Sequence, residues 1–282
     1  MTANSLLFAF VAASSVVGWG INPTVSSGMQ RPYDHEQLAS RCHCLSSCHH
    51  FSGSVKIVDN DPVANAVNLR EIHILDLETV GGDLILENPP SLVSLKGDNL
   101  KRIDGTFRMH NVIQLAALRF PQLESIGPID WFTLRSLGVF SFSHSGVSIA
   151  ENGNISISNT FLRLVENINS PSVADLVVTY NYRLIILSLA VNNVTGSIAI
   201  ENDEHLTVNL PNFEHVGNLS VSNVFKLGVP SLRTVAGPAL FNSNRFNYLN
   251  TSALTTVSRE MTYADNDEIV DISFPALASV GG

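Results

Sequence analysis

Three cysteines lie close together near the N-terminus, and the sequence contains no others. They alternate with histidines, which gives a density of thiol and imidazole groups that could bind zinc or copper. A structural zinc site would require a second, distant pair of ligands, and no further cysteine is present. A disulfide between Cys48 and Cys42 or Cys44 is the plainer interpretation in an oxidising compartment, with a metal site and a free or intermolecular thiol as open alternatives. The cluster consists of Cys42, His43, Cys44, Cys48, His49 and His50.

Carboxylates are the other residues that could carry chemistry. Cleavage of a polysaccharide needs two or three carboxylates, or a carboxylate and a base, within about 5–10 Å of each other. Glu87 and His110 come closest to such a pair, in adjacent copies of a sequence repeat, and we expect them to form an exposed ion pair. Asp83, Asp175 and Glu260 fall in copies that are not neighbours. The sequence has no nucleophile elbow, phosphate-binding loop, HExxH motif or dinucleotide fingerprint. We therefore predict no catalytic residue, no cofactor and no metal ion.

The charge balance excludes one class of partner. The chain has 16 Lys and Arg residues against 25 Asp and Glu residues, for a formal net charge of −9. The basic residues are scattered, so no cluster could neutralise a run of phosphates, and we predict no nucleic-acid partner. Apolar residues make up 45% of the chain, which is enough to build a large core.

The elements that would position these residues come from a short repeated motif. A glycine is followed by alternating residues in the pattern G-x-Φ-x-Φ-x-N, where Φ is apolar, and copies recur about every 22 residues. The second and fourth residues after the anchor are apolar in every copy, whereas the first is polar or proline. This period-two alternation predicts a strand with one face turned inward. The anchors are Gly53, Gly82, Gly105, Gly127, Gly153, Ala174, Gly196, Gly217, Gly237 and Arg259.

A second apolar pair follows the strand in most copies, for example Leu92 and Leu95. One coil cannot bury its inward side chains alone, so successive coils must stack on one another. The sequence therefore predicts an all-β fold, a right-handed parallel β-solenoid of about ten coils of about 22 residues each, over residues 53–282.

Two columns of residues follow from this stacking. The asparagine six residues after the anchor is expected to adopt left-handed backbone at a turn and to hydrogen-bond to the next coil, as a structural ladder. The third residue after each anchor is expected to point outward. The ladder consists of Asn88, Asn111, Asn159, Asn202 and Asn223, and the outer column of Lys56, Ile85, Arg108, Asp130, Ser156, Val177, Ala199, Ser220, Leu240 and Thr262.

The N-terminus has the pattern of a targeting segment. An apolar run over residues 6–17 precedes small residues at Gly18 and Gly20, which predicts a signal peptide over residues 1–20. Residues 21–52 would then form an N-terminal segment and a cysteine-containing cap. Four N-glycosylation sequons support secretion, at Asn154, Asn193, Asn218 and Asn250.

Several stretches resemble one family. The segments 48–57, 129–134, 157–162 and 274–282 are similar to those of the fungal glycosylphosphatidylinositol (GPI)-anchored cell-wall organisation proteins, which are related to sporulation-specific wall proteins and more distantly to receptor L-domains. The resemblance covers residues 48–282. It implies a secreted, non-enzymatic glycoprotein of the cell wall or cell surface, with wall polysaccharide or wall proteins as partners.

One departure from this family concerns membrane attachment. Its members usually continue into more coils, a Ser/Thr-rich stalk and an apolar tail that a lipid anchor replaces. This sequence ends at Gly282, so we expect either a fragment or a protein secreted without an anchor, with membrane contact only through a lipid anchor on a longer C-terminus. Two other functions remain as alternatives: a ligand-binding ectodomain that uses the outer column, and, more remotely, a glycan-active β-helix enzyme.

Overall fold

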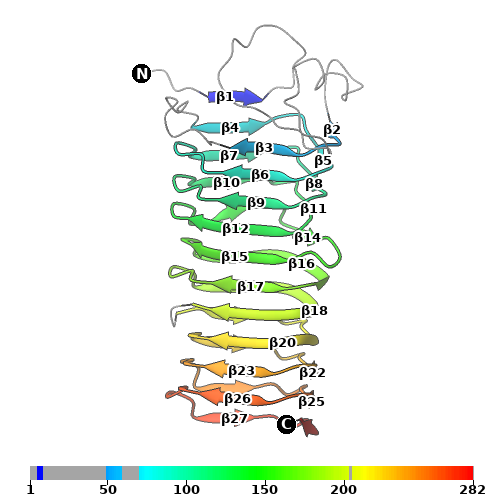
Figure 1. Ribbon diagram of the computed structural model, residues 1–282, viewed down its shortest axis with the longest axis vertical. Helices are drawn as coiled ribbons and strands as arrows, with labels where there is room; N and C mark the ends of the chain where they lie inside the picture. The colour runs from blue at the N-terminus through cyan, green and yellow to red at the C-terminus, as the bar shows by residue number, and fades with distance from the viewer. Residues whose placement is uncertain (1–4, 9–48, 59–69, 203–204, 282) are drawn as a thin grey trace. The chain divides into compact units, whose positions relative to one another are not determined.

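The fold is that of a computed structural model, which describes residues 5–8, 49–58, 70–202 and 205–281 (Figure 1). The chain divides into two compact units, unit 1 over residues 1–145 and unit 2 over residues 146–282. The described residues form β-strands and no helix, so they include no helical segment that could cross a membrane.

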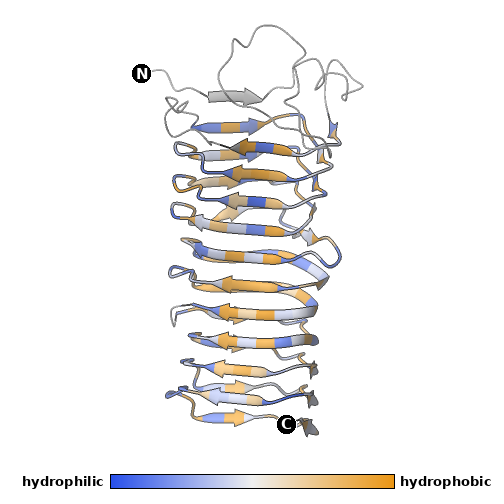
Figure 2. Ribbon diagram, in the orientation of Figure 1, coloured by the Kyte–Doolittle hydropathy of each residue, from blue (hydrophilic) through white to orange (hydrophobic). Residues whose placement is uncertain are grey.

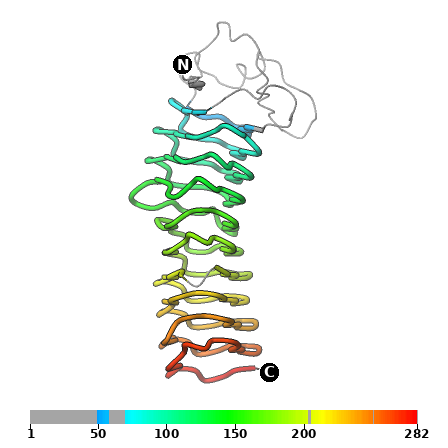
Figure 3. The backbone as a smooth tube through the Cα atoms, turned by 90° about the vertical axis from the view of Figure 1, so that its left-hand side faces the viewer, coloured from blue at the N-terminus to red at the C-terminus, as the bar shows by residue number. Residues whose placement is uncertain are grey.

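Unit 1 is built from three parallel sheets, and each coil contributes one strand to each sheet. The chain passes from β6 through β7 and β8 and then returns in β9, which pairs in parallel with β6 (Figures 1 and 3). This arrangement buries the apolar faces of all three strands against one interior. The first sheet contains β1 (Ser5–Phe8), β4 (Glu71–Ile74), β7 (Ser94–Gly97), β10 (Ala117–Arg119) and β13 (Phe140–Ser141). The second contains β2 (His50–Phe51), β5 (Thr79–Val80), β8 (Arg102–Ile103) and β11 (Ser125–Ile126), and the third β3 (Val55–Val58), β6 (Leu84–Glu87), β9 (Phe107–His110) and β12 (Ile129–Leu134).

Unit 2 repeats the parallel pairing with longer strands that continue from one sheet into the next. Its longest strand, β18, has 16 residues and pairs with β16, β17, β19 and β20. The strands are β14 (Ser148–Ile149), β15 (Ile155–Thr160), β16 (Leu164–Val173), β17 (Leu176–Thr179), β18 (Ile186–Glu201), β19 (Thr207–Asn209), β20 (His215–Ser222), β21 (Lys226–Gly228), β22 (Thr234–Val235), β23 (Ala239–Asn242), β24 (Tyr248–Asn250), β25 (Thr256–Val257), β26 (Met261–Ala264), β27 (Asp271–Ser273) and β28 (Ser279–Val280).

The prediction of an all-β parallel solenoid is confirmed. The structure has about nine turns where the sequence predicted about ten. Part of the first predicted coil, residues 59–69, lies outside the described residues, as do most of the predicted signal peptide and the three cysteines.

The cores of the two units are packed with different side chains. In unit 1 the Trp131 ring lies edge-on to Phe107 and Phe140, with centroid distances of 5.6 and 5.2 Å. In unit 2 aliphatic residues stack in register, as in the fully buried pair Ile157 and Val178. Apolar and polar residues alternate along many of the strands (Figure 2), although β6 has the sequence LILE and its first three residues are buried. The second apolar pair is also buried, except in the last coil, where Val280 is exposed.

Candidate interaction surface

The outer column forms in both units as the sequence predicted. Within each unit, each member is the register partner of the next across parallel strands. The period-two pattern therefore predicted correctly which residues share this column. The column is Lys56, Ile85, Arg108 and Asp130 in unit 1, and Ser156, Val177, Ala199, Ser220, Leu240 and Thr262 in unit 2. Ile85 is nevertheless buried. Its two register partners, Lys56 and Arg108, have long aliphatic stems that flank it on the sheet surface.

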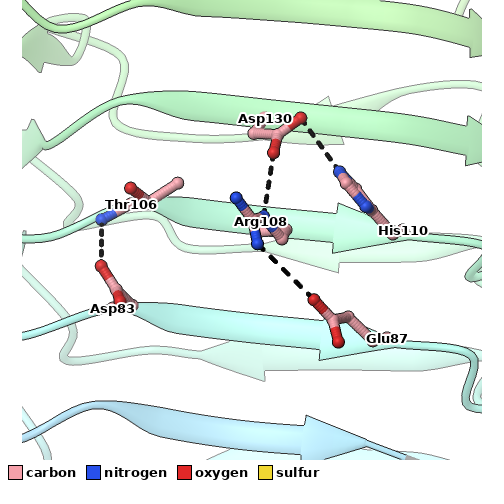
Figure 4. A network of polar contacts seen from close by, with 6 residues as sticks. All are labelled: Asp83, Glu87, Thr106, Arg108, His110 and Asp130. Carbon is pink, nitrogen blue, oxygen red and sulfur yellow. Dashed lines mark hydrogen bonds and ion pairs between the residues drawn. The ribbon is translucent and has the colours of Figure 1, made fainter.

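A charged network occupies the outer face of unit 1 (Figure 4). Arg108 Nε lies 2.9 Å from Asp130 Oδ2, and an Arg108 terminal nitrogen lies 3.7 Å from Glu87 Oε1. His110 Nε2 lies 3.0 Å from Asp130 Oδ1. The expected ion pair between Glu87 and His110 is therefore wrong. The two residues are register partners, but Glu87 contacts the guanidinium of Arg108, and the imidazole of His110 contacts Asp130.

This network is not arranged for hydrolysis. Glu87 and Asp130 lie on strands on either side of β9 and are offset by two register positions, since Glu87 is opposite His110 whereas Asp130 is opposite Arg108. Glycosidases need open space between their two carboxylates for the sugar and a water molecule. Here the guanidinium of Arg108 occupies that space and contacts both groups. Ion pairs this exposed contribute little to stability, about 0–1 kcal/mol each.

A polar ladder that was not predicted from the sequence runs beside the anchor glycines. In unit 1 the Asp83 backbone N–H donates to Ser54 Oγ at 2.9 Å, and the Thr106 N–H donates to Asp83 Oδ1 at 2.7 Å. A Cβ added at Gly105 would collide with Asp83 Oδ1. It would also lie 2.6 Å from the Gly82 carbonyl carbon, so glycine is needed here because the backbone of the preceding coil approaches closely.

The same ladder in unit 2 includes two of the predicted glycosylation sites. Asn154 Oδ1 accepts from the Asp175 N–H at 3.2 Å, and Asn218 Nδ2 donates to Ser197 Oγ at 3.0 Å. Both asparagines are exposed. Asn193 is half-buried, with Nδ2 3.3 Å from the carbonyl of Pro171. Asn250 is the last residue of β24, and its side chain lies outside the described part of the structure.

The asparagine ladder separates into two groups. Asn88, Asn111, Asn159 and Asn223 have φ between 53° and 55°, the left-handed region, and Asn111 Nδ2 donates to Asn88 Oδ1 at 3.0 Å. Asn202 does not adopt this conformation. Its buried side chain points into the coil, where Oδ1 accepts from the Asn181 N–H at 2.8 Å, so its assignment to the left-handed ladder is wrong.

Asn202 belongs instead to a buried amide ladder that was not predicted from the sequence, and the other members of this ladder lie one position further along the turn, seven residues after their anchors. Asn181 Oδ1 accepts from the Thr160 N–H at 2.9 Å, and Asn244 Oδ1 accepts from the Val224 N–H at 3.1 Å. Each amide satisfies a backbone group that the coil interior would otherwise leave without a partner. The signal was present as a second recurrent asparagine, at Asn181, Asn244 and Asn266.

Within the part of the chain that the structure describes, no three His, Cys, Asp or Glu residues converge as metal ligands. The cluster around Cys42, Cys44 and Cys48 is outside that part, so its disulfide stays a prediction.

Comparison with known proteins identifies the relatives of this chain. It is 29% identical over 241 residues to "Protein ecm33" of Aspergillus fumigatus, covering 84% of this chain and 57% of the relative. It is 26% identical over 240 residues to "Cell surface GPI-anchored protein" of Arthroderma benhamiae, covering 84% and 59%. It is 23% identical over 229 residues to "Cell wall protein ecm33" of Schizosaccharomyces pombe, covering 81% and 53%. The chain is a homologue of these fungal proteins.

The homology to Ecm33 confirms the resemblance predicted from the repeat segments. The chain spans a little over half the length of these Ecm33-like relatives, 53–59%. No protein-family model matches it, and no solved structure matches it.

Proposed function

We propose that this protein is a secreted, non-enzymatic glycoprotein that contributes to the organisation and integrity of the fungal cell wall. The observation that carries the proposal is similarity over more than four fifths of the chain to proteins named for the cell wall and the cell surface. The charged network supports a non-enzymatic role, since its two carboxylates are both engaged by Arg108.

The partners would be wall polysaccharide or other wall proteins. A GPI-anchored relative supports attachment of the full-length protein to the cell surface by a lipid anchor. Release of the full-length protein from intact cells by a phosphatidylinositol-specific phospholipase would support this attachment.

Disruption of the gene in the source fungus is expected to sensitise the wall to a chitin-binding dye and to wall-digesting enzymes. The protein should be recovered from the wall or cell-surface fraction. A turnover screen of the purified protein against β-glucans, chitin, mannan and pectin should release no reducing ends. A cytosolic protein with a wall of normal resistance would contradict the wall role, and release of sugar would contradict the non-enzymatic role.

Glycan occupancy is expected at Asn154 and Asn218, because both side chains are exposed beside the anchor glycines and a sugar there would extend away from the core. Asn154→Gln should lower the mass by one glycan, as measured by mass spectrometry of the secreted protein before and after glycosidase treatment. Ser156→Ala is the matched control, since it removes the sequon but keeps the hydrogen bond from Asp175 to Asn154. Peptides with both asparagines unmodified would contradict the prediction.

A further inference from the structure

An exposed aromatic turn follows the outer strand β17 in unit 2. Tyr180 and Tyr182 are 50% and 58% exposed, although large aromatic residues usually contribute to folding by being buried. Ile185, on the same turn, is also exposed. The Arg183 guanidinium lies over the ring of Phe161 from the preceding coil, 4.3 Å from its centroid. We call this group the tyrosine turn; it consists of Phe161, Tyr180, Tyr182, Arg183 and Ile185.

The backbone of Tyr180 is in an unfavourable conformation for its residue type. Its φ is 56°, in the left-handed region, and Asn159 and Asn223 occupy the same turn position with φ of 54° and 53°. Asparagine tolerates this conformation, whereas a residue with a bulky side chain seldom adopts it. Folding alone would favour asparagine at position 180. Backbone strain of this kind at an exposed side chain is a reason to look for a function.

The turn is held rigidly between the two tyrosines. The side chain of Asn181 is 1% exposed. Its Oδ1 accepts from Thr160 N–H and Oγ1 at 2.9 and 2.7 Å, and its Nδ2 donates to the Ile157 carbonyl at 2.9 Å. The Asn181 N–H donates to Asn202 Oδ1 at 2.8 Å. Because the backbone between the rings is fixed by four hydrogen bonds, little conformational entropy would be lost when a ligand orders the tyrosines.

We propose that the tyrosine turn binds a chain of pyranose sugars. This inference rests on the proposed wall function and names a ligand class and a site for it. The apolar faces of the exposed rings suit the C–H faces of a sugar ring, and the tyrosine hydroxyls and the Arg183 guanidinium can hydrogen-bond its hydroxyl groups. The stack of Arg183 on Phe161 holds the guanidinium in place on this turn.

Two other classes of ligand fit the turn less well. Within residues 153–195, all of which the structure describes, Arg163 and Arg183 are the Lys and Arg residues, too few to neutralise a polyanion or an anionic membrane surface. A stable protein interface buries about 800 Å² on each partner, a wider surface than one turn of five side chains presents. A small, rigid and amphipathic surface matches a single polysaccharide chain.

The test uses the secreted protein with its N-glycans trimmed, so that attached sugars do not compete for the site. Binding is measured by co-sedimentation with insoluble β-1,3-glucan and with chitin, and by titration with soluble mannan. The wild-type protein should bind at least one of the three. Tyr182→Ala should weaken that binding by about tenfold or more, as truncation of an aromatic anchor typically does.

Tyr180→Asn separates binding from folding. It should also weaken binding, yet leave the thermal midpoint unchanged or higher, because asparagine suits the left-handed conformation. Tyr248→Ala is the matched control, since Tyr248 is 67% exposed on β24 outside the tyrosine turn, and it should bind as the wild type does.

Several results would overturn the inference. One is that the wild-type protein binds none of the three polysaccharides. Another is that Tyr182→Ala and Tyr180→Asn bind as tightly as the wild type. A third is that Tyr248→Ala loses as much binding as Tyr182→Ala does. A change in self-association of the tyrosine variants, seen by analytical ultracentrifugation without a change in sugar binding, would indicate a protein interface instead. Wall localisation and dye sensitivity are measured separately, so the wall function can stand if sugar binding fails.

Discussion

Aspartate at Ile157 is expected to abolish secretion of folded protein, whereas aspartate at the adjacent Ser156 should be tolerated. Ile157 is fully buried on β15 and stacks in register on Val178, while Ser156 faces outward beside Val177. The first change buries a carboxylate without a partner and removes apolar contacts, and each effect typically costs several kcal/mol. A whole domain is stable by only about 5–15 kcal/mol.

Ser156→Asp is the matched control because it introduces the same side chain one residue away. It stays in contact with water, so the expected cost is under about 1 kcal/mol. Secretion yield and thermal midpoint of the two variants, measured side by side, decide the result. Ser156→Asp also removes the Asn154 sequon, so the proteins should be compared after deglycosylation. Equal tolerance of the two variants, or a worse outcome at Ser156, would contradict the register of β15.

The outward and inward faces of the long sheet could be predicted because apolar and polar residues alternate along the sequence of its strands. In the stretch from Gly153 to Asn159, isoleucine and polar residues alternate without interruption, and the structure places them accordingly. The short strands β5, β8 and β11 have two residues each and too little length to show a period, so a third sheet could not be recognised in this way.

The polar contacts were less predictable, because they depend on side-chain reach as well as on register. Glu87 and His110 are opposite each other, but the longer side chain of Arg108 contacts Glu87 and leaves His110 to Asp130. Asn202 has the spacing of the left-handed ladder but a different backbone conformation, which turns its amide into the coil. Tyr180 adopts the left-handed conformation at a position where several other copies of the repeat have asparagine. The path of the coil therefore determines the turn geometry, and the residue type alone does not.

The buried amide ladder gives the second large effect. Asn181→Ala should destabilise unit 2 by several kcal/mol. The change removes the acceptor of both the Thr160 N–H and the Thr160 hydroxyl inside the coil, together with one donor to the Ile157 carbonyl. Thr160 is fully buried, so water cannot replace the lost amide without opening the turn. Each buried polar group left unsatisfied costs about 1–3 kcal/mol.

Asn209→Ala is the control for this variant. Asn209 is exposed on β19, where its Nδ2 contacts Ser188 Oγ at 3.4 Å, and water can take over that contact. Its truncation should therefore change stability by less than about 0.5 kcal/mol. Denaturant titrations of the two variants give the comparison, and hydrogen exchange should show lost protection at the Thr160 amide in Asn181→Ala alone. If both variants unfold at the same denaturant concentration as the wild type, the amide ladder does not support the coil. The asparagines inside unit 2 would then have to be explained by something other than backbone satisfaction.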